Sequence, residues 1–344
     1  MENFYKVVKI QDKGFGCVAL QDIKIGTLIL IDHAKCVAQQ ELKTEGLFYE
    51  YFESQIESFL SMSQNDQEEF LKLHNRFEDS NTFSNDDEAD YFLKLKQFSE
   101  IYSFYNDPGL LEEFDENLAL IVLGIYATNS FPEGVGIKIS RFNHSCRPNA
   151  EVIWFQEDEV EVRAISKIKT GQEITIPYNK KMVMKNYKTR QEFYSGLGGF
   201  KCCCELCQEE AINCDDEIYE VFQRLENEVE KAMLEKPAQL LEKKYENYEK
   251  MISCLKQMYK IAKDKRAPKL FIVELLNKGC MAGVQGYLSA KMIHDFGKME
   301  YFREEIQKLA RVAEHIATLT LGRESPTARE WKERNKNFEK WFTE

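Results

Sequence analysis

The most informative stretch of the sequence is RFNHSCRPNAEV, residues 141–152. Asn, His, Ser and Cys stand side by side at positions 143–146 and are followed by Arg-Pro-Asn. A run of small and medium polar side chains suits neither a helix interior nor a strand, so it predicts a loop. Loops held by a rigid scaffold commonly carry binding or catalytic groups. The apolar EVIWF that follows predicts a strand, which would supply such a scaffold.

Length, composition and charge limit the class of protein. The chain has 344 residues, of which 43% are hydrophobic, and this predicts packed cores in two or three domains. The formal net charge of −12 argues against direct nucleic-acid binding, which needs clustered positive charge. It is compatible with a basic protein partner, but also simply with solubility. No apolar run is long enough for a membrane span, and MENFYKVVKI lacks a signal-peptide core. We therefore expect an intracellular protein of the cytoplasm or nucleus.

The ten cysteines are unevenly distributed. Inside a cell they are not expected to form a disulfide framework, so most should be buried thiols. The cluster KCCCELC, residues 201–207, is different because its spacing favours metal binding. Cys202, Cys204 and Cys207 offer three thiolates, whereas a structural zinc ion needs four ligands. Cys203 interrupts the cluster and is a competing ligand.

The pattern of residues predicts an α+β fold. The first forty residues contain three strand-like runs, FYKVVKI, CVALQDI and KIGTLILIDHAKCVA, with glycines between them. Helical spacing of apolar residues follows at 41–62 and 90–105, with a polar acidic loop at 78–90 between them, and a buried helix is expected to end near Asn129. Strand character returns in GIKIS, AEVIWF, EVEVRAI and EITIPY, within residues 136–178.

The last third of the chain is predicted to be helical. We expect about six amphipathic helices between 215 and 342, with breaks near Pro237, Pro268, Gly297 and residues 322–326. Antiparallel helix pairs are the simplest way to bury such faces.

Five motifs occur in a definite order along the chain. They are Lys13-Gly14-Phe15-Gly16, Asn129-Ser130-Phe131, Asn143-His144-Ser145-Cys146, Gly171-Gln172-Glu173-Ile174 with Tyr178, and the CxCxxC of Cys202, Cys204 and Cys207. The first motif alone is weak, and it lacks the third glycine and the helix of a dinucleotide fingerprint. Together the five resemble a SET-domain protein-lysine methyltransferase of the SMYD-like branch.

This resemblance implies a division of the chain into five parts. They are a SET N-terminal part (1–40), a helical insertion (41–125), a SET C-terminal part (126–185), a post-SET zinc-binding segment (186–210) and a helical TPR-like domain (211–344). One departure is large: SMYD proteins carry a MYND zinc finger inside the SET domain, but residues 37–145 contain no cysteine. Binding functions of that finger are therefore not expected here.

The resemblance also implies a cofactor. The family transfers a methyl group from S-adenosylmethionine to a lysine amine without a covalent enzyme intermediate, so the protein chiefly positions both partners. The implied cofactor contacts are Lys13, Gly14, Phe15, Gly16, Asn129, Ser140, Asn143, His144, Tyr178 and Phe200. Phe200 would pack on the adenine. Asn129 could instead be a helix cap, and His144 could contribute through its backbone alone or as a structural histidine.

For the reaction itself, Tyr178 matches the family's catalytic tyrosine, which would orient the amine. An ordinary tyrosine pKa of about 10 makes it a poor general base. Phe131 would line an aromatic channel that favours the uncharged lysine by desolvation. Tyr194 could replace the channel aromatic that relatives carry where this chain has Gly198.

The resemblance supplies Cys146 as the fourth ligand of one structural zinc ion, with Cys202, Cys204 and Cys207. The leading hypothesis is therefore an S-adenosylmethionine-dependent lysine methyltransferase acting on a histone or another basic protein. The alternative is a weakly active or inactive SET scaffold that binds a protein partner through its helical domain. A peptide-binding groove in that domain is a further possibility.

Overall fold

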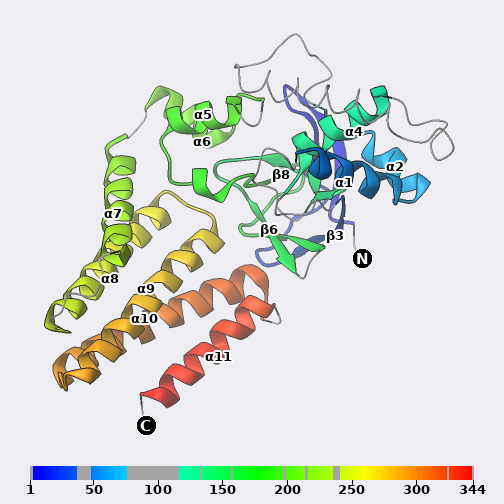
Figure 1. Ribbon diagram of the computed structural model, residues 1–344. Helices are drawn as coiled ribbons and strands as arrows, with labels where there is room; N and C mark the ends of the chain where they lie inside the picture. The colour runs from blue at the N-terminus through cyan, green and yellow to red at the C-terminus, as the bar shows by residue number, and fades with distance from the viewer. Residues whose placement is uncertain are drawn as a thin grey trace.

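The structure is a computed structural model that describes residues 3–36, 48–75, 116–131, 134–155, 158–196, 199–213, 216–234, 241–323 and 325–342. Its β-strands gather in the N-terminal half, with α1, α2 and α4 on one side (Figure 1). A helical region, α7 to α11, forms the rest of the molecule. The predicted combination of a β-rich part and a helical C-terminal region is confirmed.

The three strands predicted in the first forty residues are present. They are β1 (Tyr5–Ile10), β2 (Gly14–Ala19) and β3 (Leu28–Cys36). β1 and β2 form an antiparallel hairpin in which Tyr5 pairs with Ala19 and Ile10 with Gly14. The turn needs left-handed backbone at Asp12 (φ 60°) and Gly14 (φ 72°), and a glycine adopts this conformation without strain.

Two four-stranded sheets form the β-rich part. The later strands are β4 (Val135–Gly136), β5 (Asn143–His144), β6 (Ala150–Phe155), β7 (Glu159–Ala164) and β8 (Glu173–Ile176). The strand orders are β1-β2-β8-β5 and β4-β3-β7-β6. Alternate residues of β7 are buried, as a half-buried strand requires.

The strand predicted over GIKIS is largely wrong. Only Gly136 lies in β4, and Ile139–Arg141 form a 3-10 turn, η2. The buried Asp32 causes the turn, because its carboxylate accepts hydrogen bonds from the backbone N–H groups of Lys138 (2.9 Å) and Ile139 (3.0 Å). The Asp32 carboxylate thus accepts the backbone hydrogen bonds that a neighbouring strand would otherwise accept.

Among the described residues, three helices lie beside the sheets: α1 (Phe48–Leu60), α2 (Gln64–Phe70) and α4 (Glu116–Asn129). The last one ends where the sequence predicted. The helix predicted at 90–105 and the loop at 78–90 fall outside the described residues. The connection to the helical region contains η3 (Lys180–Met182), α5 (Tyr187–Gly196) and α6 (Glu205–Ile212).

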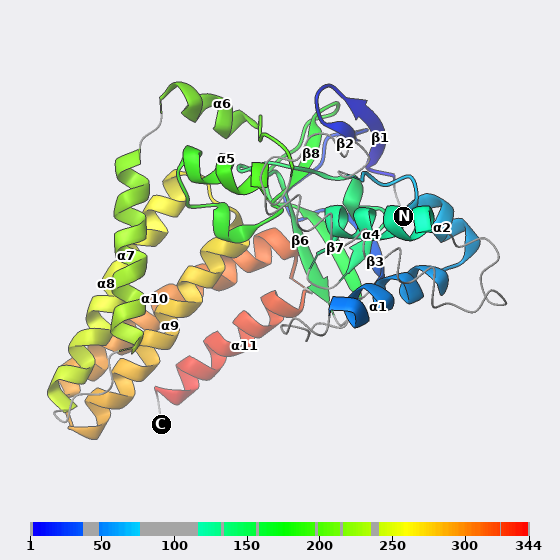
Figure 2. The ribbon, with the colours of Figure 1, turned by 45° about the horizontal axis from the view of Figure 1, so that its top comes forward.

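The helical region contains α7 (Asp216–Leu234), α8 (Leu241–Asp264), α9 (Lys269–Met292), α10 (Phe296–Leu321) and α11 (Pro326–Trp341). They lie roughly alongside one another (Figure 2). The described residues form five helices here, one fewer than the expected number of about six, and the expected breaks near Pro237, Pro268 and residues 322–326 fall between these helices. The expected break at Gly297 falls instead at residues 293–295, and Gly297 belongs to the first turn of α10.

Each part has its own apolar core. Ile23, Val160 and Ile174 are among the residues that fill the space between the sheets. Phe222, Leu276 and Phe302 are among those that fill the helical core. Burying a side chain of this size contributes about 1.5–3 kcal/mol, so both cores are substantial. No helix in the described part of the chain combines the length and apolarity needed to cross a membrane.

The two parts are joined by specific contacts. Glu151 of β6 has no exposed surface, and its carboxylate accepts a hydrogen bond from the backbone N–H of Leu270 in the first turn of α9 (3.2 Å). Lys180 lies 3.8 Å from the same carboxylate. The C-terminal end of α10 contacts the β-rich part. There the backbone carbonyl of Leu319 lies so close to Gly26 that a Cβ at position 26 would be 2.7 Å from the carbonyl oxygen.

Candidate functional site

The Asn-His-Ser-Cys loop is held in place by a short parallel pairing. β5 pairs with β8 so that Asn143 lies opposite Thr175 and His144 opposite Ile176. Asn149 extends this arrangement with its side chain. Its amide donates to the carbonyl of Glu173 (2.8 Å) and accepts from the N–H of Thr175 (2.8 Å). The loop predicted from the sequence is thus fixed beside the strand that leads to Tyr178.

His144 is a buried link within this arrangement. Its Nδ1 accepts a hydrogen bond from the backbone N–H of Tyr178 (3.2 Å), and its Nε2 lies 3.3 Å from the sulfur of Cys146. Because Nδ1 accepts, the ring proton belongs on Nε2. Burial lowers the pKa of His144 to about 4, so the ring is neutral near pH 7. The His144 side chain therefore holds the backbone at Tyr178 in place.

Tyr178 follows β8 and points its hydroxyl into the fold. That hydroxyl donates to the carbonyl oxygen of Phe142 (3.0 Å), although 42% of the residue's surface is exposed. Burial raises the pKa of Tyr178 above its ordinary value, and the negative charge of Glu173 adds to this. The group therefore remains a phenol at neutral pH and can position a partner, but it cannot serve as a base.

Three aromatic rings meet at this point. The Tyr178 ring centre lies 5.3 Å from that of His144 and 6.1 Å from that of Phe200, and the distance from His144 to Phe200 is 6.2 Å. Tyr194 packs behind them, stacked at 5.3 Å on Phe200, and only 2% of it is exposed. Tyr194 thus packs against the rings of both His144 and Phe200.

Phe131 has a different environment. Its ring lies 5.7 Å from that of Trp154 of β6, and it packs against the core between the sheets. Within the described residues, no ring contact joins Phe131 to the group around Tyr178. Phe131 and Tyr194, the two aromatic residues predicted to line a substrate channel, are therefore not in contact with each other in the described residues. Gly198 lies outside the described residues.

The Lys13–Gly16 turn meets the Asn-His loop through Glu173. Lys13 forms an ion pair with one oxygen of this carboxylate (2.8 Å), and Asn143 donates to the other (2.8 Å). Gly16 makes this possible, because a Cβ there would lie 2.5 Å from the amide nitrogen of Asn143. Phe15 is 57% exposed next to the turn. Glu173 was part of a sequence motif, but its organising role was not predicted.

Two other predicted cofactor residues bind the protein itself. Asn129 ends α4, and its amide donates to the carbonyls of Ile125 and His74 (both 2.7 Å). This is the helix-cap alternative considered above. Ser140 donates to the carbonyl of Gly136 (2.7 Å).

Four cysteine thiols converge in the same region. The sulfurs of Cys146, Cys202, Cys204 and Cys207 all lie within 4.8 Å of one another and are buried. The Cys146 sulfur is 3.8 Å from that of Cys202 and 3.6 Å from that of Cys207. A tetrahedral zinc ion with Zn–S bonds of about 2.3 Å places its sulfurs about 3.8 Å apart, so this set fits zinc. Cys203, the competing ligand, is exposed and outside the set.

A buried charge network next to these thiols was not predicted. The side chain of Arg190 has no exposed surface and lies 2.6 Å from Glu210 and 3.7 Å from the sulfur of Cys207. Burial opposes the charge of Arg190, but Glu210 and the nearby thiolates outweigh it and raise its pKa. Tyr219 of α7 donates to the same carboxylate. No sequence signal indicated this network, because α5 and α6 look like ordinary polar helices.

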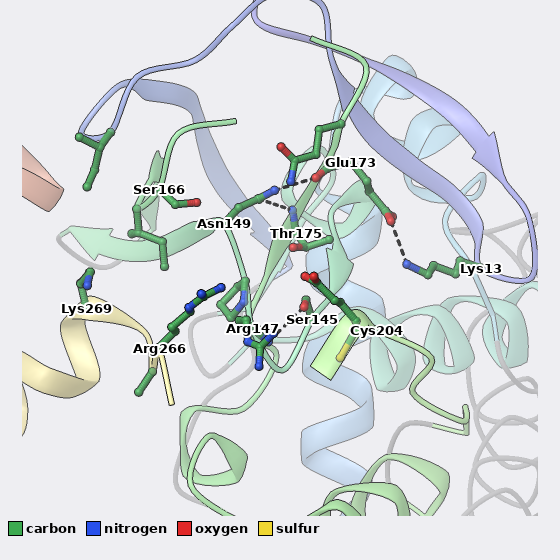
Figure 3. A pocket seen from close by; sticks show the side chains of 16 residues that line it. Lys13, Ser145, Arg147, Asn149, Ser166, Glu173, Thr175, Cys204, Arg266 and Lys269 are labelled. Atoms are coloured by element: carbon green, nitrogen blue, oxygen red, sulfur yellow. Dashed lines mark hydrogen bonds and ion pairs between the residues drawn. The ribbon is translucent and has the colours of Figure 1, made fainter. Parts of the chain in front are cut away.

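A cavity of about 580 Å³ lies where the sheets, the cysteine segment and the helical region meet (Figure 3). Lys13, Glu173 and Ser145 line it from the β-rich part, and Arg266 and Lys269 line it from the segment between α8 and the start of α9. Tyr178, His144 and Phe200 are not among its lining residues.

Comparison with known proteins identifies the β-rich part. Residues 14–179 match the model of the SET domain. The SET domain-containing protein L678 of Acanthamoeba polyphaga mimivirus is 26% identical over 247 residues, covering 66% of this chain and 84% of the relative. Histone-lysine N-methyltransferase set5 of Schizosaccharomyces pombe is 28% identical over 208 residues, covering 60% and 51%. Histone-lysine N-methyltransferase SMYD3 of Homo sapiens is 34% identical over 84 residues, covering 24% and 19%.

Residues 14–179 of the chain are therefore assigned to the SET domain. The chain's relatives include proteins named histone-lysine methyltransferases, SMYD3 among them, and this confirms the resemblance inferred from the motifs. The chain spans most of the viral relative, about half of the fission yeast protein and about a fifth of the human one.

Proposed function

We propose that this protein is an S-adenosylmethionine-dependent protein-lysine methyltransferase. The observation that carries the proposal is the position of Tyr178, whose hydroxyl is anchored to the Phe142 carbonyl while its ring faces His144 and Phe200. This arrangement lies within a SET domain whose relatives include histone-lysine methyltransferases. A histone or another basic protein is the proposed substrate, in keeping with the acidic charge of the chain, and a histone would place the enzyme in the nucleus or cytoplasm.

The residues present fit the cofactor. When bound, S-adenosylmethionine would supply an activated methyl group on its sulfonium sulfur. Phe200 offers an aromatic face of the kind that accepts an adenine ring, and the exposed Phe15 and the Lys13 turn lie at the neighbouring wall. These groups would bind and orient the cofactor, while the neutral His144 ring holds the backbone beneath it.

Tyr178 would position the substrate lysine. Its hydroxyl hydrogen is donated to Phe142, so the oxygen lone pairs remain available to accept an N–H of the amine. Because the pKa of Tyr178 is raised, the phenol does not take the lysine proton, and the amine has to lose it to water. Exclusion of water by the surrounding aromatic rings would favour the uncharged amine.

We further propose that Cys146, Cys202, Cys204 and Cys207 hold one structural zinc ion. The ion would tie the Asn-His loop to the segment that carries Phe200, two stretches separated by more than fifty residues. The helical region would then act as a TPR-like domain packed against the catalytic part.

The proposal can be tested with labelled S-adenosylmethionine, core histones and a cell extract. The wild type should label lysines, and Tyr178→Phe should reduce the rate at least tenfold while leaving cofactor affinity within a few-fold. Tyr301→Phe, on the helical region, is the matched control and should label normally. Failure to bind the cofactor in calorimetry, together with no labelling, would refute the proposal.

A second function is supported by a separate observation. Four side chains expected to bind the cofactor already have partners within the protein: Lys13, Asn129, Ser140 and Asn143. This favours, as an alternative, a weakly active scaffold that binds a protein partner through α7–α11. Such a scaffold would bind S-adenosylmethionine weakly or not at all, whereas the enzyme would bind it in the same calorimetric experiment.

A further inference from the structure

The cavity at the junction of the two parts has an unusual charge for this protein. Its lining contains four basic side chains, Lys13, Arg147, Arg266 and Lys269, and two acidic ones. The chain as a whole carries a formal charge of −12. A pocket with an excess of positive charge is therefore a local feature that opposes the overall field of the molecule, and such clefts concentrate anions.

The two acidic groups of the pocket differ: Glu205 is exposed and forms no ion pair within the described residues, so it offsets one of the four positive charges, whereas Glu173 has a partner within the pocket wall. Glu173 is bound by both Lys13 and Asn143, so this carboxylate and the Lys13 ammonium neutralise each other. The remaining cations belong to three separate segments. Arg147 follows the Asn-His-Ser-Cys loop, Arg266 lies in the turn after α8, and Lys269 is the first residue of α9.

These three cations are available to a ligand to different degrees. No ion pair or hydrogen bond of the Arg266 or Lys269 side chain occurs within the described residues, and Arg266 is exposed. Arg147 pairs with Glu209 through one terminal nitrogen (3.0 Å), but its Nε is buried and has no hydrogen-bond partner. A buried N–H of a guanidinium without a partner is unfavourable, so a ligand that accepts from it would be stabilised.

Figure 3 shows the side chains of Arg147 and Arg266 entering the pocket from opposite segments, with Ser145, Ser166 and Thr175 around them. Guanidinium groups match the geometry of phosphate oxygens through paired hydrogen bonds, and hydroxyl groups add further donors. The volume of about 580 Å³ is that of a small-molecule site, larger than a single inorganic ion requires.

We propose that this junction pocket binds a small phosphate-bearing molecule, at a site separate from Tyr178. Its ligands would be Arg147, Arg266 and Lys269. Because these residues come from the SET part and from the turn between α8 and α9, an occupied pocket would hold the two parts together. The proposal does not depend on methyl transfer, since none of the three cations contacts the residues around Tyr178.

Isothermal titration calorimetry of the zinc-loaded chain of 344 residues tests the proposal, with pyrophosphate and inorganic phosphate as probes. We expect one pyrophosphate to bind per chain, more tightly than phosphate because it offers acceptors to all three cations. Arg266→Gln with Lys269→Gln should weaken pyrophosphate binding at least tenfold. The matched control is Lys260→Gln with Lys263→Gln, which removes the same charge from exposed positions on α8 and should change the affinity less than twofold.

Three results would overturn the inference. The first is the absence of pyrophosphate binding at millimolar concentration. The second is an equal loss of affinity in the two double variants, which would indicate a general charge effect. The third is binding that persists in Arg266→Gln with Lys269→Gln and is accompanied by release of zinc, which would indicate chelation of the metal by the probe.

Discussion

Replacing Glu210 by Gln would test the buried charge network between the cysteine segment and the helical region. Glu210 is 6% exposed and compensates Arg190, whose side chain is fully buried. The substitution keeps the size of the side chain but removes its charge. Tyr219 would keep a hydrogen-bond acceptor, whereas the guanidinium would lose its counter-ion.

The size of the effect follows from the burial of this pair. Removing one partner of a buried ion pair costs about 3–5 kcal/mol because the other charge is left without compensation. In the variant, the Arg190 guanidinium would still donate to the carbonyl of Lys185 and would still lie 3.7 Å from the sulfur of Cys207. These contacts would stabilise part of its positive charge. We therefore expect Glu210→Gln to lower the free energy of unfolding by about 3 kcal/mol, the lower end of this range.

Urea unfolding at pH 7, followed by circular dichroism on protein of measured zinc content, gives this free energy. Glu300→Gln is the matched control. It breaks an exposed pair with Arg303 (3.4 Å) and should cost less than about 0.5 kcal/mol. The double variant Arg190→Met with Glu210→Leu should recover part of the loss, since it leaves no buried charge.

Equal destabilisation by Glu210→Gln and Glu300→Gln would refute this reasoning. So would strictly additive effects of the Arg190 and Glu210 substitutions, because residues coupled through one network are expected to deviate from additivity.

Two other predictions concern pH and metal. Burial raises the pKa of Glu151 to about 7, above the ordinary value for a glutamate, so the native state holds its proton more tightly and loses stability as the pH rises through this range. Relative to the wild type, Glu151→Gln should therefore gain about 2.5 kcal/mol between pH 5 and pH 8, measured by urea unfolding; no change with pH would contradict the assignment. Cys207→Ser should lose most of the bound zinc and at least about 3 kcal/mol of stability, whereas the exposed Cys203→Ser should keep both, as elemental analysis and unfolding would show.

The local elements were predictable because their signals are local. The strand-like composition of EVEVRAI predicted β7, and the apolar run that ends near Asn129 predicted α4. Five ordered motifs together were specific enough to indicate a SET domain. The predicted division of the chain into five parts, and the individual cofactor contacts, stay predictions.

The failures have identifiable causes. GIKIS has strand-like composition, but Asp32, more than a hundred residues earlier, binds its backbone and turns it. The expected number of about six helices was one more than the four expected breaks require, and those breaks lie at or near the boundaries between α7, α8, α9, α10 and α11. At GIKIS, a contact with a residue distant in the sequence outweighed the local preference for a strand.

From the order of its residues alone, this protein could be recognised as a β-rich SET part followed by helices, with a loop and a cysteine cluster that carry its chemistry. The union of Cys146 with the cluster near residue 204, the pairing of Arg190 with Glu210, and the gathering of cations in the junction pocket arise only in the folded chain. Periodicity reports which face of an element is buried, but it carries no information about which distant side chain will lie opposite, since that depends on how whole elements pack.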